Sequence, residues 1–276
     1  MPRASRFARD RHALYEAAVQ GVEYDLDFFE RVWRATRGGR FRDLREDFCG
    51  TAQLACAWAA RRRQNRAWGL DLDPEVLAWS RRERLSRLGE AARRVTLLER
   101  DVRSVTRPAA EVVVALNYSF WIFHQRAELA RYFRAVRRSL RADGLFFLSM
   151  FGGTAAMDRL TEKHRVASCP GPDGVPLPAF TYVWEQAEFN PVDHRLLCHI
   201  HFRFRDGSGM RRAFRYDWRM WTVPEVREVL AEAGFRASEF YVEGWDETEN
   251  RPDETLRRRS RFENQLGWLG MIVGVA

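Results

Sequence analysis

Apolar residues in the first part of the chain fall into two kinds of segment that alternate with each other. Short apolar runs predict buried strands, and apolar residues at spacings of about three to four predict amphipathic helices. Strands are expected at 43–48, 67–71, 95–98, 112–116 and 145–151, and helices between them at 51–63, 74–88 and 125–140. Strands joined by helices of this length pair in parallel, which predicts an α/β fold with a doubly wound sheet.

The pattern differs at the two ends of this core. A helix is predicted over 10–37, because Gly38 and Gly39 end its apolar pattern. Beyond the core, a helix at 223–233, a strand at 236–243, a charged loop at 245–262 and a strand at 266–275 are expected. The chain is thus divided into an N-terminal helical segment (1–40), a core (41–153), an insertion (154–221) and a return to the core (222–276). The core sheet is predicted to be mostly parallel and seven-stranded.

The insertion has the period of antiparallel strands. Segments 180–189, 196–204 and 211–220 alternate apolar and polar residues, and turn residues at 190–191 and 206–209 join them. We expect a three-stranded antiparallel lid. Its polar positions include His199, His201 and Arg219, which are candidates for acceptor binding.

Composition argues against a disordered, a membrane-spanning or a secreted, disulfide-rich protein. Hydrophobic residues make up 46% of the 276 positions, enough for a buried core, and no apolar run reaches the roughly 18 residues of a membrane helix. The N-terminus lacks the apolar stretch of a secretory signal, and the four cysteines have no C-x-x-C spacing. We expect a cytoplasmic protein that does not contact a membrane.

Net charge is one property that favours nucleic acid as a partner. The formal charge is +8, but Lys163 is the only lysine, and the arginines fall in short groups on expected solvent-facing helix surfaces. We therefore do not expect nucleic acid to be a partner.

Acidic and glycine residues follow three successive strands of the predicted core. Gly50 lies between a strand and a helix, Asp71 ends the next strand 21 residues later, and Asp101 follows the third. A glycine turn with an acid about 20 residues further on is typical of sites that bind a nucleotide through its ribose.

The order Glu46, Cys49-Gly50-Thr51, Asp71-Leu72-Asp73-Pro74, Asp101 and Asn117 resembles class I, Rossmann-like methyltransferases that use S-adenosylmethionine. The resemblance covers about residues 40–151, and the segments Glu-Asp-Phe-Cys-Gly-Thr and Gly-Leu-Asp-Leu-Asp-Pro resemble a group whose acceptors are unassigned. It implies S-adenosylmethionine as the cofactor, with Glu46 and Gly50 in the turn, Asp71 on the ribose hydroxyls and Asp101 at the adenine. The cofactor contacts it implies are Tyr15, Glu46, Phe48, Cys49, Gly50, Thr51, Asp71, Leu72, Asp101, Val102 and Asn117.

The turn departs from the family pattern, because Phe48 and Ala52 occupy two of its three glycine places. A dinucleotide needs these glycines so that the backbone can approach a pyrophosphate, which S-adenosylmethionine lacks. This favours a methyltransferase over an NAD-dependent dehydrogenase. It also leaves open a catalytically silent subunit that binds S-adenosylmethionine.

The acceptor is expected beyond the fourth strand, at Asn117, Tyr118, Trp121 and His124. Asn117 offers a carbonyl oxygen to an acceptor N–H, the aromatic rings can enclose the methyl group, and His124 is the best single base. Asn117 and Phe120 keep the spacing of adenine-N6 methyltransferases, but the two prolines of that motif are missing. The main prediction is methyl transfer to a nitrogen or oxygen of a small molecule, with a nucleic-acid base as the alternative. No metal is expected, because His199-x-His201 has no third ligand at a suitable spacing, and the sequence does not indicate an oligomeric state.

Overall fold

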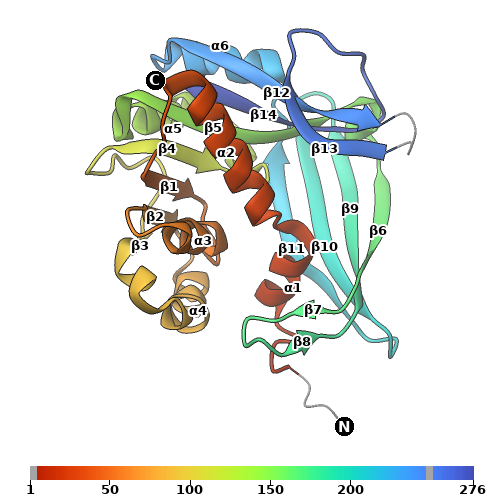
Figure 1. Ribbon diagram of the computed structural model, residues 1–276. Helices are drawn as coiled ribbons and strands as arrows, with labels where there is room; N and C mark the ends of the chain where they lie inside the picture. The colour runs from red at the N-terminus through yellow and green to blue at the C-terminus, as the bar shows by residue number, and fades with distance from the viewer. Residues whose placement is uncertain (1–4, 247–250) are drawn as a thin grey trace. The chain divides into compact units, whose positions relative to one another are not determined.

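The computed structural model describes residues 5–246 and 251–276, and the chain divides into two compact units (Figure 1). The smaller unit contains the described residues up to Gly21 together with Met157–Met220, and the larger contains Val22–Ala156 and Trp221–Ala276. Within residues 5–246 and 251–276, no helix combines the length and apolarity that a membrane span requires.

The larger unit is built on one sheet of eight strands in the order β13-β12-β14-β5-β4-β1-β2-β3. Pairing is parallel from β5 to β3 and antiparallel between β5 and β14, β14 and β12, and β12 and β13. The strands are β1 (Asp43–Asp47), β2 (Arg66–Asp71), β3 (Val95–Glu99), β4 (Ala110–Ala115), β5 (Leu140–Gly152), β12 (Ala237–Asp246), β13 (Arg251–Arg258) and β14 (Trp268–Val275). The predicted mostly parallel α/β sheet is confirmed. The predicted count of seven strands is wrong, because residues 251–258 of the expected charged loop pair with β12 as an eighth strand; residues 247–250 of that loop lie outside the described part.

Helices cover both faces of this sheet, as two adjacent residues of β5 show. The ring of Phe147 lies 4.6 Å from that of Phe29 on α2, and the ring of Phe146 lies 5.7 Å from that of Phe133 on α5. Successive strand residues point to opposite faces, so α2 and α5 lie on opposite sides and the sheet is doubly wound. The helices of this unit are α2 (Val22–Arg37), α3 (Gln53–Arg61), α4 (Pro74–Glu83), α5 (Arg126–Ser139) and α6 (Val223–Glu232), with short 3-10 turns at η1 (Leu85–Arg87), η2 (Gly89–Arg94), η3 (Ser119–Ile122) and η4 (Thr154–Met157).

The smaller unit is an antiparallel sheet with one helix. Its strands lie in the order β11-β10-β9-β6, and a separate two-stranded hairpin joins β7 and β8. The bounds are α1 (Arg11–Val19), β6 (Leu160–Val166), β7 (Cys169–Pro170), β8 (Pro176–Leu177), β9 (Phe180–Asn190), β10 (Arg195–Phe204) and β11 (Gly209–Arg219). Three of the four strands match the predicted meander. The fourth, β6, was not predicted because its residues are nearly all exposed and show no apolar alternation.

Leu14 on α1 packs with Phe180, Ile200 and Phe202 on one face of this antiparallel sheet. The predicted single helix over 10–37 is wrong. Gln20 adopts an extended conformation after α1, and the chain resumes helical structure at Val22 in the other unit. Because the apolar pattern continues past Gly21, it does not reveal that one unit ends there and the other begins at Val22.

Candidate functional site

The turn between β1 and α3 contains three residues in the left-handed region of φ. Phe48, Gly50 and Ala52 have φ values of 56°, 50° and 55°. This region favours glycine, because a Cβ there comes too close to the backbone. The alternation explains why glycines at these three places are typical of the family, and it shows that this chain keeps the turn with only one of them.

Hydrogen bonds join this turn to the end of β2. Asp71 Oδ2 accepts from the Gly50 N–H at 2.8 Å, and Asp71 Oδ1 accepts from the Asp73 N–H at 3.0 Å. Asp73 in turn caps α4 by accepting from the Glu75 N–H at 2.9 Å. The structure therefore brings together the glycine turn and the strand-end acid that the sequence singled out. Leu72, between the two acids, is 62% exposed and available to a ligand.

Carboxylates gather at this edge of the sheet. Burial raises the pKa of Glu46 to about 8, although the Ala55 N–H donates to its Oε2 at 2.9 Å, and Asp71 and Asp25 add repulsion. Burial likewise raises the pKa of Asp25 on α2 to about 7. A cation placed beside these carboxyl groups would favour their ionised forms. Asp25 was missed by the sequence analysis, because nothing in the pattern of α2 separates it from the solvent-facing acids Glu23 and Asp27.

Two polar atoms of the same turn are buried without a partner among the described residues. They are Thr51 Oγ1 and Gln53 Oε1, which stand at the start of α3. Buried polar atoms are usually hydrogen-bonded, and these two oxygens are available to accept hydrogen bonds from a ligand in the turn. Cys49 in the same turn is buried, and burial raises its pKa well above the usual value, which disfavours the reactive thiolate.

The loop after β3 is held by a buried arginine that the sequence analysis also missed. Arg45 on β1 is fully buried and donates to Asp47 Oδ1 at 2.6 Å, to the Val102 carbonyl at 2.7 Å and to the Ser104 carbonyl at 3.0 Å. Asp101 accepts from the Arg103 side chain, which lowers the pKa of that carboxyl. The predicted adenine residues thus lie in a fixed loop, and their contact with adenine stays a prediction. A charged residue within a buried strand departs from the apolar pattern, and the sequence does not show the partners that stabilise it.

The chain after β4 is strained where the acceptor residues are predicted. Asn117 and Tyr118 have φ values of 51° and 58°, and the Tyr118 N–H donates to Ser149 Oγ at 3.2 Å. Such conformations cluster at functional sites. Asn117 and His124 are partly exposed, whereas Trp121 is fully buried, with its ring 4.7 Å from that of Phe151.

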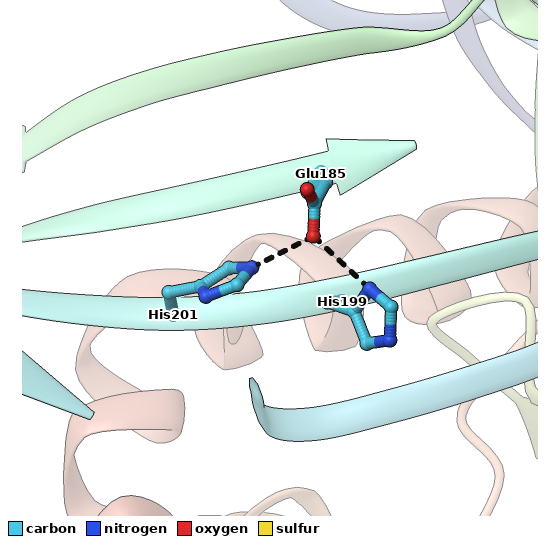
Figure 2. A group of neighbouring side chains, drawn as sticks. All are labelled: Glu185, His199 and His201. Carbon is cyan, nitrogen blue, oxygen red and sulfur yellow. Dashed lines mark hydrogen bonds and ion pairs between the residues drawn. The ribbon is translucent and has the colours of Figure 1, made fainter. Parts of the chain in front are cut away.

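The other predicted contacts belong to the smaller unit. Tyr15 lies on α1, where the Tyr216 hydroxyl donates to it and burial raises its pKa to about 12. His199 and His201 share a face of β10, and Glu185 on β9 accepts from both (Figure 2). The statement that this histidine pair lacks a third ligand is therefore wrong. Glu185 is 14 residues from His199 in sequence and reaches it only through strand pairing. Arg219 ends β11.

A family model matches the part of the chain from the glycine turn onward. The family model described as a methyltransferase domain matches residues 48–144, which run from the glycine turn into β5. No curated protein matches the chain.

Solved structures of methyltransferases share the fold over nearly the whole chain. CalS10 of Micromonospora echinaspora, an amino pentose methyltransferase with bound SAM, is 18% identical at a TM-score of 0.66, covering 96% of this chain and 95% of that one. KedS8 of Streptoalloteichus sp ATCC 53650, a sugar N-methyltransferase, is 19% identical at 0.62, covering 100% and 96%. DesVI of Streptomyces venezuelae is 15% identical at 0.68, covering 99% of each chain. The domain match over residues 48–144 and this shared fold confirm the predicted resemblance to class I methyltransferases.

Proposed function

We propose that this chain transfers a methyl group from S-adenosylmethionine to a nitrogen or oxygen atom of a small-molecule acceptor. The observation that carries the proposal is the direct hydrogen bond between the Gly50 N–H and Asp71, which unites the turn and the ribose acid in one site. Residues 48–144 match a methyltransferase domain, and the structural neighbours include enzymes that act on amino pentoses and sugars.

Asp71 has the capacity to hold a ribose. A carboxylate has about four acceptor positions, and two are used by the Gly50 and Asp73 N–H groups. Two positions remain, which matches the two vicinal hydroxyls of a ribose.

Glu46 and Asp25 fit the charge of the cofactor, because S-adenosylmethionine carries a sulfonium and an ammonium group. Their raised pKa values show that ionisation is costly without a nearby cation. The bound cofactor would supply an activated methyl group, and Thr51 and Gln53 would gain partners for their orphan oxygens.

Acceptor binding is proposed at Asn117, Tyr118, Trp121 and His124 of the larger unit. In the proposed transfer, Asn117 orients the acceptor with its side-chain carbonyl, and His124 takes the proton that the acceptor nitrogen or oxygen loses. A reaction at an already activated carbon depends mainly on such positioning. The strained backbone at 117–118 supports this role.

The test combines binding with transfer. Calorimetry should show binding of S-adenosylmethionine and S-adenosylhomocysteine and none of NAD. Radiolabelled methyl groups should then pass to a member of a panel of amino sugars and other small amines and alcohols. Binding of NAD alone would refute the proposal. Binding without transfer to any acceptor would identify a silent subunit, and labelling confined to RNA or DNA would identify a nucleic-acid base methyltransferase.

A further inference from the structure

Glu185, His199 and His201 form a compact cluster within the smaller unit. His199 on β10 lies directly opposite Glu185 on β9 in the antiparallel register, and His201 follows two residues later on the same face. Glu185 Oε2 lies 3.0 Å from His199 Nδ1 and 3.0 Å from His201 Nε2, so the two rings converge on a single oxygen (Figure 2). Within the described part of the chain, these side chains are the group of three that can offer metal ligands.

The donor set and its spacing suit a transition-metal ion. Two imidazole nitrogens and one carboxylate are ligands that zinc prefers. The three candidate ligand atoms lie within 4.8 Å of one another. Ligand atoms bound at about 2.0–2.1 Å in a tetrahedral zinc site lie roughly 3.4 Å apart. The two 3.0 Å separations therefore need to open only slightly, and side-chain rotation can bring the two histidine nitrogens together.

The cluster is anchored on one side and reachable on the other. His199 is 3% exposed and His201 is 14% exposed, whereas the Glu185 side chain is 35% exposed. Rigid histidines reduce the entropy lost when a metal binds, and an exposed carboxylate gives the ion a route in. Three protein ligands would leave a fourth position open for water or another oxygen or nitrogen ligand.

Without a metal, the cluster depends on two protons. Glu185 Oε2 is the shared hydrogen-bond partner of His199 Nδ1 and His201 Nε2. An ionised carboxylate accepts hydrogen bonds and donates none. With Glu185 ionised, His199 therefore carries a proton on Nδ1 and His201 carries one on Nε2. Both N–H groups then donate to Glu185 Oε2. A metal ion would take the place of these two protons, because each histidine can move its proton to the other ring nitrogen.

Two neighbouring groups act against a cation, and both can be accommodated. The Arg212 N–H donates to His201 Nδ1 at 3.2 Å, a contact that His201 must give up when Nδ1 takes the proton. It is exposed, so water can replace it at a cost that is small beside metal coordination. Arg215 lies opposite His199 on β11, but its side chain is 58% exposed and its charge is paired with Asp217.

We propose that Glu185, His199 and His201 form a binding site for a divalent ion of the zinc type, with one coordination position open. The proposal replaces the expectation that the histidine pair binds no metal. It is independent of the proposed methyl transfer, because it concerns residues of the smaller unit alone.

Binding is tested on the full chain after treatment with a chelator. Zinc titrated into the protein should give one equivalent of binding by calorimetry, and cobalt should give the visible absorption of a four-coordinate site. Glu185→Gln and His201→Gln should each weaken zinc binding at least about tenfold. These two variants are preferred over a change at His199, whose burial puts folding at risk. The matched control is His164→Gln, which removes the exposed Glu162–His164 pair on β6 of the same sheet and should leave binding unchanged.

Nitrogen-detected histidine NMR adds a readout that depends on the geometry. On addition of zinc, the shifted signals should be Nδ1 of His199 and Nε2 of His201. Absence of one-equivalent binding, an equal loss of affinity in His164→Gln, or retained affinity in Glu185→Gln would overturn the proposal and leave a hydrogen-bonded cluster only.

Discussion

Replacement of Asp71 by alanine separates the cofactor role of this acid from its role in the fold. The change removes the oxygen atoms that accept hydrogen bonds from the Gly50 and Asp73 N–H groups. The Asp73 N–H is exposed and can bind water instead. We expect the free energy of unfolding to fall by about 1–2 kcal/mol. It also removes the proposed ribose acceptors. Charged hydrogen bonds contribute about 1.5–3 kcal/mol, so Kd should rise roughly ten- to a hundredfold.

Asp73→Ala is the matched control. Asp73 caps α4, and the loss of an N-cap costs about 1 kcal/mol of stability. The two variants should therefore be destabilised to a similar extent, while the control keeps the wild-type affinity. A difference between them in ligand binding cannot then be attributed to a general loosening of the loop.

Urea unfolding with and without S-adenosylhomocysteine measures both quantities. At a ligand concentration of 100 times the wild-type Kd, the ligand should stabilise wild type and Asp73→Ala by about 2.7 kcal/mol. If Kd rises about fiftyfold, the same concentration stabilises Asp71→Ala by only about 0.6 kcal/mol. Equal stabilisation of the two variants would show that Asp71 does not bind the ribose, and the reasoning from the strand-end acid would fail.

Three further predictions concern the rest of the larger unit. Asn117→Gly removes the side-chain amide but suits the positive φ at this position. Turnover should fall about tenfold or more, with the cofactor Kd nearly unchanged, and an unchanged rate would exclude Asn117 from the acceptor site. Arg45→Met leaves buried Asp47 without its cation and should lower the free energy of unfolding in urea by about 3–5 kcal/mol, against less than about 0.5 kcal/mol for the exposed Arg93→Met. A loss below about 1 kcal/mol at Arg45 would contradict the buried network. Glu46 has a pKa raised to about 8, so the folded state binds more protons than the unfolded state, and stability should fall as pH rises from about 4.5 to 8. Glu46→Gln should remove this part of the pH dependence in urea unfolding measured at several pH values, and an unaltered profile would show that the buried carboxyl does not titrate there.

The sequence by itself determined the larger part of the core and its cofactor motifs. Gly50 follows β1 and Asp71 is the last residue of β2. Because parallel strands end at one edge of a sheet, the local pattern predicts that these two residues meet. The meander at 180–220 was equally visible, because alternation of apolar and polar residues reports a half-buried strand without any knowledge of its partners.

Only the tertiary structure decided the features that depend on partners far apart in the chain. Five of the eight residues at 251–258 are charged, and this segment forms a strand by pairing with β12 at the edge of the sheet. Arg45 is tolerated in a buried strand because five oxygen atoms surround its guanidinium. Glu185 meets His199 through the register of β9 and β10, which is set by the packing of whole strands rather than by the spacing of residues. Local pattern reports which face of an element is buried, whereas a cross-strand contact exists only once the register is fixed.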